Sequence, residues 1–388
     1  MSKIDRIEKI SSAVSATTMV LHRTRCASMR YWHSRCRKCL DACPHDAIKR
    51  TAGHLDIDSQ VCTNCGSCAA ACPTGTFATS SPSQTEIVRQ ARKTAEEYNN
   101  IACFACERLA GQLFLDTERV VVLPCLDYLD EYLLIGLLSC GIKNVAVFKQ
   151  SCEGCTICGT PRIEATVKRA RNLCKDWNVS GKPKLFSEVP PELCGMRGPT
   201  KSSGESKRDA FKGTGGSLLG YAVKNVDEVF GAAKQEPKKR SERVYVEFDD
   251  KFDANTCRSG RLLAMLSRLG TPPHGKTIES GLWASVNIDT STCRRCGMCA
   301  KLCPTDALHY EQPTAPRERG QKRVPATLVF TPSACINCGL CKDSCYNHSL
   351  LLSTRIPADQ LLSEQTQLLY DDEPPEIRKS SCSKIKKA

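Results

Sequence analysis

Two runs of regularly spaced cysteines near the carboxyl end constrain the fold of this chain more than any other feature. Each run has four cysteines in the spacing C-x2-C-x2-C-x3-C, which is a spacing that holds iron–sulfur clusters. Structural zinc usually takes cysteines in two separate pairs, so we prefer clusters to a pair of zinc sites. The runs are Cys293, Cys296, Cys299 and Cys303, followed by Pro304, and Cys335, Cys338, Cys341 and Cys345, followed by Tyr346 where proline is usual.

The spacing also predicts how these eight thiols divide between two 4Fe–4S clusters. The fourth cysteine of each run starts a short helix that faces away from its own loop, so it ligates the other cluster. One cluster is therefore expected on Cys293, Cys296, Cys299 and Cys345. The other is expected on Cys335, Cys338, Cys341 and Cys303.

Short strand-like segments precede and follow both runs, at residues 286–288, 307–309, 328–330 and 350–352. Together with the cysteine runs, this pseudo-twofold layout resembles the bacterial dicluster ferredoxins. The resemblance implies a module with two 4Fe–4S clusters that transfers electrons.

A second copy of this pattern lies near the amino end but departs from it at one position. Cys62, Cys65, Cys68 and Cys72, followed by Pro73, keep the full spacing. Cys36, Cys39 and Cys43, followed by Pro44, match the last three positions, while the first position falls on His33.

Three arrangements would complete the first amino-terminal cluster. Cys26 could supply the missing thiolate, His33 could bind iron through its imidazole, as in Rieske centres, or the cluster could lack one iron. We favour Cys26, because thiolate is the softer ligand. The expected sets are then Cys26, Cys36, Cys39 and Cys72 for one cluster, and Cys62, Cys65, Cys68 and Cys43 for the other.

Between the two modules, apolar runs at 120–123 and 144–148 predict strands, and helices are expected at 128–139 and 162–177. This β-α-β-α order predicts parallel strands, whose carboxyl ends form the functional edge of such a sheet. Cysteines follow both strands and a further short apolar stretch at 100–102, so we predict a further cluster there, with 2Fe–2S as one candidate type. A zinc site or a redox-inert docking domain is the alternative. The candidate ligands are Cys103, Cys106, Cys125 and one of Cys152, Cys155 or Cys158.

This middle region, about ninety residues long, contains CFAC, VVVLPC, LLIGLLSCGIKNVAVF and SCEGC. It resembles the small iron–sulfur delta subunit of methyl-viologen-reducing hydrogenases. The resemblance implies a subunit that passes electrons between a hydrogenase or formate dehydrogenase and a heterodisulfide reductase.

The 27 cysteines of the chain are expected to be reduced. The first twenty residues carry charges throughout and lack the apolar stretch of a secretory signal, and no apolar run reaches the roughly 18 residues of a membrane span. We therefore expect a cytoplasmic protein without a membrane span. The net charge of +13 fits a solvated surface or the docking of an acidic redox partner, and no motif indicates nucleic-acid binding.

These observations predict an α+β chain in which two dicluster ferredoxin-like modules flank a small α/β domain with a parallel sheet. We expect electron transfer through four 4Fe–4S clusters, without catalysis, as a subunit or partner of an anaerobic oxidoreductase. Candidate partners are formate dehydrogenase, hydrogenase, a flavoprotein, a molybdenum subunit or a heterodisulfide-reductase-like complex, and the alternative is a redox sensor or assembly factor for such an enzyme. The expected boundaries are a helical segment at 1–20, modules at 21–85 and 246–355, the α/β domain at 86–190, a linker at 191–245 and a tail at 356–388.

Overall fold

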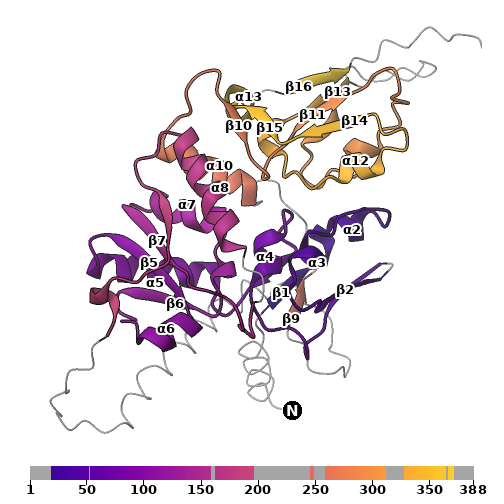
Figure 1. Ribbon diagram of the computed structural model, residues 1–388. Helices are drawn as coiled ribbons and strands as arrows, with labels where there is room; N and C mark the ends of the chain where they lie inside the picture. Colours follow the sequence, from indigo (N-terminus) through magenta and orange to yellow (C-terminus); the bar gives the residue numbers. More distant parts are fainter. Residues whose placement is uncertain are drawn as a thin grey trace, which may run out of the picture.

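The computed structural model describes residues 19–51, 53–158, 162–195, 245–248, 258–311, 327–363 and 366–370. These residues form an amino-terminal part, a middle part built on a parallel sheet, and a carboxyl-terminal part, which lie against one another (Figure 1). Most of the expected linker, all of the tail from residue 371 and residues 1–18 fall outside the described residues. No helix among the described residues is long and apolar enough to cross a membrane.

The amino-terminal part consists of short elements separated by loops that carry cysteines. Strand β1 (Met19–His22) pairs antiparallel with β4 (Phe77–Thr79) and parallel with β9 (Tyr245–Phe248). Met19 and Leu21 are buried and alternate with less buried neighbours, so residues 19 and 20 form a strand and not the end of the helix expected at 1–20. The other elements are α2 (Ala27–Arg30), α3 (Lys38–Ala42), the antiparallel hairpin of β2 (Ile48–Thr51) and β3 (His54–Ile57), and α4 (Ser67–Ala71).

The middle part is a sheet of four parallel strands in the order β6-β5-β7-β8, which confirms the parallel sheet predicted from the sequence. The predicted strands at 120–123 and 144–148 are β6 and β7. The helix expected at 128–139 begins three residues later, because a 3-10 turn occupies Leu126–Tyr128 and the Asp130 carboxylate caps the helix by accepting from Leu133 N at 2.7 Å. The elements are α5 (Gln84–Glu97), β5 (Ile101–Cys106), α6 (Glu107–Leu113), β6 (Val120–Leu123), α7 (Glu131–Ser139), β7 (Asn144–Phe148), α8 (Ile163–Asp176) and β8 (Pro183–Phe186).

The two faces of this sheet pack against different helices. Phe104 and Val147 face a large core that α5, α7 and α8 complete. Cys103 and Ala105 face a smaller core with Leu109 of α6. Alternation along β5 therefore decides to which side each of its cysteines points.

The carboxyl-terminal part repeats the pattern of short strands around cysteine loops, and its strands pair β11 with β14, β10 with β15, and β13 with both β12 and β16, all antiparallel. The strand segments predicted at 286–288, 307–309, 328–330 and 350–352 correspond to β11, β12, β13 and β14. The elements are α10 (Arg258–Leu269), β10 (Thr277–Glu279), β11 (Ser285–Ile288), α11 (Met298–Lys301), β12 (Leu308–Glu311), β13 (Thr327–Phe330), α12 (Leu340–Ser344), β14 (Leu350–Ser353), β15 (Arg355–Pro357), α13 (Ala358–Leu362) and β16 (Gln367–Tyr370).

Helix α10 packs against α7 of the middle part, although its residues fall within the range 246–355 expected for the carboxyl-terminal module. Its Leu262 and Leu266 are fully buried in the same core as Ile356 and Leu361. The contact is close because Gly136 of α7 has no side chain; a Cβ there would lie 3.3 Å from the sulfur of Met265. Residues assigned to the carboxyl-terminal module and to the tail thus complete the core of the middle part.

Candidate metal centres

The first amino-terminal set, called site I, consists of the thiols of Cys26, Cys36, Cys39 and Cys72. Burial, with a smaller effect of the neighbouring thiols of Cys72, Cys26 and Cys36, raises the pKa of Cys39 to about 12. Burial likewise raises the pKa of Cys26, with Cys72 and Cys36 as neighbours. Cys26, Cys39 and Cys72 also belong to one apolar cluster, so the structure brings Cys26 beside the other thiols of this set.

The structure places His33 outside this group. Its ring is exposed and lies beside the ring of Trp32, with 3.8 Å between the ring centroids. The Trp32 side chain is itself 71% exposed. The imidazole therefore belongs to a surface loop and not to the group of buried thiols.

The second amino-terminal set, site II, consists of Cys43, Cys62, Cys65 and Cys68. These four cysteines line one hollow with about 370 Å³ of empty space, together with apolar side chains such as Ile48. Burial raises the pKa of Cys68 well above its usual value, and Cys65, Cys62, Cys39 and Cys43 add to the effect. Since Cys39 belongs to site I, sites I and II are neighbours.

In the carboxyl-terminal part, Cys303, Cys335, Cys338 and Cys341 line a hollow with about 340 Å³ of empty space, called site IV. Burial raises the pKa of Cys335 to about 11 and that of Cys338 to about 12, and Cys303 adds to both shifts. Cys303 comes from the other cysteine run, so the exchange of the fourth cysteine expected from the spacing fits this arrangement.

The remaining carboxyl-terminal set, site III, is Cys293, Cys296, Cys299 and Cys345. Burial, with a smaller effect of the neighbouring Cys293 and Cys296, raises the pKa of Cys299 to about 11. Cys345 packs in the same apolar cluster as Cys299. The Cys296 thiol is exposed, so this site is the most accessible of the carboxyl-terminal part.

Backbone geometry shapes the ligand loops. Gly66, Gly297 and Gly339 each have φ between +77° and +80° and precede a short helix that carries the next cysteine. A Cβ on Gly66 would lie 2.7 Å from the ring of Tyr128, and one on Gly297 would lie 2.9 Å from the ring of Tyr310. Two of the loops therefore need glycine both for the left-handed conformation and for the close approach of a tyrosine.

Backbone N–H groups also point at several of the thiols. Ala47 N donates to Cys43 Sγ at 3.3 Å, Thr76 N to Cys72 Sγ at 3.4 Å, and Ser349 N to Cys345 Sγ at 3.3 Å. All described cysteines are free thiols. Groups of four soft sulfur donors, most of them partly or fully buried and surrounded by N–H groups and apolar side chains, fit the binding of 4Fe–4S clusters.

The middle part has a further hollow at the carboxyl edge of its sheet, with about 540 Å³ of empty space. We call it the middle site. Arg108 and Lys149 also border this hollow, so positive charge lies beside the sulfurs. Burial raises the pKa of Cys155, but hydrogen bonds from the backbone of Cys158 and Ile157 and from Arg108 outweigh burial and lower it overall. The cysteines that line the hollow are Cys106, Cys125, Cys152, Cys155 and Cys158.

The structure does not bring Cys103 into this group. Cys103 is fully buried in the small core between the sheet and α6 and is not among the residues that line the hollow; burial raises its pKa to about 12. Cys106 stands three residues later on the same strand, which reverses its direction, and it lines the hollow.

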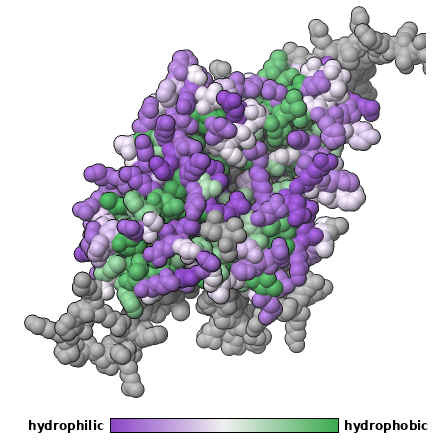
Figure 2. Space-filling view, viewed as in Figure 1, coloured by the Kyte–Doolittle hydropathy of each residue, from purple (hydrophilic) through white to green (hydrophobic). Residues whose placement is uncertain are grey.

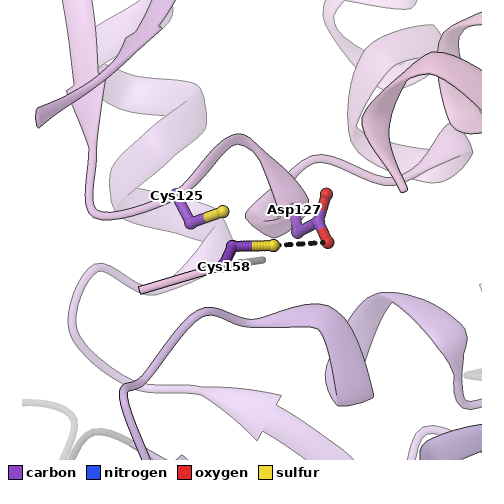
Figure 3. A group of neighbouring side chains, drawn as sticks. All are labelled: Cys125, Asp127 and Cys158. Atoms are coloured by element: carbon purple, nitrogen blue, oxygen red, sulfur yellow. Dashed lines mark hydrogen bonds between the residues drawn. The ribbon is translucent and has the colours of Figure 1, made fainter. Parts of the chain in front are cut away.

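Asp127 is a residue of this site that the sequence reasoning missed. The thiols of Cys125 and Cys158 and a carboxylate oxygen of Asp127 all lie within 4.8 Å of one another, and all three residues are buried (Figure 3). The Cys158 thiol donates to Asp127 Oδ2 at 3.6 Å. The sequence signal that could have found it is a carboxylate two residues after Cys125, the cysteine that follows the strand at 120–123.

The middle site lies against site II. Cys65 of site II packs with Cys125 and Cys158, and its thiol donates to Ser67 Oγ at 3.3 Å. Ser67 Oγ then donates to Asp127 Oδ2 at 2.7 Å. Thr63 Oγ1 also donates to the backbone carbonyl of Ile157 at 2.8 Å, so the loop before Cys158 is held on the amino-terminal part.

Comparison with known proteins agrees with the metal chemistry of the two cysteine-rich parts. Residues 33–76 and 292–349 match the family model described as a 4Fe-4S dicluster domain. Two stretches, one toward each end of the chain, are thus similar to iron–sulfur domains of the ferredoxin type. A protein of Escherichia coli (strain K12) named as an electron transport protein, YsaA, is 32% identical over 98 residues, which are 24% of this chain and 55% of that protein. The chain therefore matches about half the length of this relative.

Proposed function

We propose that this chain is an electron-transfer protein that passes single electrons through four 4Fe–4S clusters, held at sites I to IV. The observation that carries the proposal is the gathering of sixteen thiols in four groups of four within and beside the two matched stretches. The clusters supply reversible one-electron chemistry, and the protein supplies thiolates, N–H donors and apolar surroundings that set their potentials. The similarity to a protein named for electron transport supports this function.

We also propose that the middle site binds a further cluster, with 2Fe–2S as the candidate type. Five cysteines line the hollow, which is more than a four-ligand cluster needs. Arg108 and Lys149 offset the charge of the thiolates there. The packing of Cys65 against Cys125 and Cys158 supports electron exchange between this site and site II.

The partners we propose are redox proteins of an anaerobic oxidoreductase, such as formate dehydrogenase, hydrogenase, a flavoprotein, a molybdenum subunit or a heterodisulfide-reductase-like complex. Site III offers a docking surface for a partner with acidic residues, because the exposed Cys296 thiol is accompanied by exposed Arg294 and Lys301. Tyr346, which follows Cys345, is 86% exposed. On the face seen in Figure 2, hydrophilic residues separate the apolar patches, which favours a polar, charge-guided contact.

Anaerobic purification followed by iron and sulfide counting tests the proposal. Four 4Fe–4S clusters require about sixteen irons per chain, and a 2Fe–2S cluster at the middle site would raise the count to about eighteen. A count below about twelve, together with the absence of reducible EPR signals, would contradict the four-cluster arrangement.

The second candidate function is a redox sensor or assembly factor for such an enzyme. Site I favours it, because Cys26 lies outside the matched stretch 33–76 and the loop between Cys26 and Cys36 carries the exposed Trp32. A sensor requires that this site lose its cluster in air while sites II to IV keep theirs. Iron counting and EPR during controlled exposure to oxygen distinguish the two functions, because a relay protein would lose the signals of its sites together.

A further inference from the structure

The two cysteine-rich parts contact each other through the loops that carry their cysteines. Lys38 Nζ donates a hydrogen bond of 2.9 Å to the backbone carbonyl of Asn337. Lys38 directly precedes Cys39 of site I, and Asn337 directly precedes Cys338 of site IV. The contact therefore joins one ligand loop to another, although the two loops lie about 300 residues apart in the chain.

A second contact holds the same two segments together. Asp343, in α12 between two cysteines of the carboxyl-terminal part, accepts from the backbone N of Arg35 at 2.7 Å and from Ser34 Oγ at 3.3 Å. Ser34 is only 3% exposed, and its hydroxyl also accepts from Cys36 N at 3.3 Å. The loop of site I is thus fixed on the carboxyl-terminal part at two points.

The Lys38 ammonium group acts on the cysteines of site IV and belongs to the loop of site I. Burial raises the pKa values of Cys335 and Cys338, and the positive charge of Lys38 lowers both. In the site I loop, Lys38 directly precedes Cys39 in the chain. A charge held between two partly buried sites is screened less than a surface charge, so it favours the more negative state of each.

We propose that Lys38 joins the two dicluster parts into one electron path, by holding the loop of site I against the loop of site IV and placing one positive charge beside both. The inference rests on the proposed function. The step is a one-electron transfer in which one site is oxidised as the other is reduced, with no bond or proton changed; redox proteins supply and remove the electron.

Other neighbours extend the path at both ends. Cys299 of site III is close enough to Cys341 of site IV to raise its pKa, and Cys39 of site I likewise raises the pKa of Cys68 of site II. Cys65 of site II packs against the middle site. The resulting order is site III, site IV, site I, site II and the middle site, and the Lys38 contact is the joint at which the two parts meet.

The test is Lys38→Gln in the full chain, purified anaerobically. Iron and sulfide are counted first, and the site potentials are then measured by redox titration followed by EPR. We expect an unchanged iron count and a fall in two of the four site potentials, because removal of a positive charge disfavours the reduced state. The rate of electron exchange between the two parts should fall severalfold, and Lys38→Arg should restore both potentials.

Arg37→Gln is the matched control, because Arg37 lies in the same loop but pairs with Asp41 of its own part at 3.2 Å. It should alter at most the potential of site I. A fall in only one potential for Lys38→Gln, no fall, or the same two shifts for Arg37→Gln would overturn the inference. If Lys38→Gln lost iron, Asp343→Asn would test the same contact, because Asp343 binds the site I loop from the carboxyl-terminal part. An unchanged magnetic interaction between sites I and IV in that variant would overturn the inference. A wild-type chain without clusters would instead contradict the proposed function itself.

Discussion

Asp127 accepts a hydrogen bond from the thiol of Cys158 at 3.6 Å while only 2% of Asp127 is exposed. Its other oxygen accepts from the backbone N of Arg162 at 2.9 Å and of Ile163 at 3.1 Å, at the start of α8. Ser67 Oγ, at the start of α4 beside the cysteines of site II, donates to Asp127 Oδ2, the oxygen that also accepts from Cys158. One buried carboxylate therefore fixes the middle site, the start of a helix and the neighbouring cysteine loop.

Replacement of this carboxylate should affect both stability and metal content. We expect Asp127→Asn to destabilise the middle part by about 3 kcal/mol, because an amide accepts through one oxygen only and turns its NH2 group toward existing donors. The middle site should also lose iron. Iron counting and denaturant unfolding under anaerobic conditions measure the two effects. Glu118→Gln, at an exposed position of the same part, is the control and should leave both unchanged.

The missing ligand of site I can be identified by two substitutions. Cys26→Ser should lower the iron content by about four per chain, because site I loses a buried thiolate. His33→Ala should leave the iron content unchanged, since the imidazole lies on the surface. Iron loss in His33→Ala with full iron in Cys26→Ser would reverse the assignment.

The cysteines of β5 should behave differently from each other. Cys106→Ala should reduce the iron bound at the middle site, because Cys106 lines the hollow. Cys103→Ala should keep that iron and lower the free energy of unfolding by about 1 kcal/mol, since it only leaves a small void in the core. Equal iron loss in the two variants would contradict the sidedness of the strand.

The ligand-loop glycines provide a matched pair for backbone and steric effects. Gly66→Ala should destabilise by about 3 kcal/mol, because alanine meets both the left-handed conformation and the ring of Tyr128. Gly339 has nearly the same φ, but a new Cβ there would meet open space, so we expect Gly339→Ala to destabilise the protein by about 1 kcal/mol. Unfolding midpoints of the two variants, measured side by side, test the difference. Equal destabilisation would show that the Tyr128 contact adds nothing.

Arg258 connects three parts of the molecule. Its guanidinium donates to the backbone carbonyls of Ala69 and Ala70 in α4 and lies 3.0 Å from Asp130, the buried cap of α7. We expect Arg258→Ala to destabilise by about 3 to 5 kcal/mol, because Asp130 is left as a buried charge without its partner. Thermal unfolding measures the loss. Arg268→Ala, exposed on the same helix, should change the midpoint little.

Local patterns allowed the sheet and the thiol groups to be predicted from the sequence. The apolar runs of β6 and β7 lie between turns, and their length and β-branched residues indicate buried strands. The spacing within one cysteine run depends on the reach of one loop, which brings Cys62, Cys65 and Cys68 to one hollow and Cys335, Cys338 and Cys341 to another. These features involve residues close in sequence, which is why short-range reasoning finds them.

Features that depend on distant packing could not be predicted in the same way. The direction of Cys103 depends on which sheet face α6 covers, and the residues around Cys103 do not reveal this. The role of Asp127 requires that Ser67 and Cys158 be neighbours, although they are far apart in the chain. Packing of α10 on α7 likewise depends on the shape around Gly136.

The parallel pairing of β1 with β9 has a consequence for synthesis of the protein. Strand β1 finds β4 within the first eighty residues, but its other edge is paired only by residues 245–248. On the ribosome, the amino-terminal part therefore emerges with an open strand edge, and that edge stays unpaired until residues 245–248 have been translated. Insertion of the clusters proposed at sites I and II can thus begin on a nascent chain whose sheet is still incomplete.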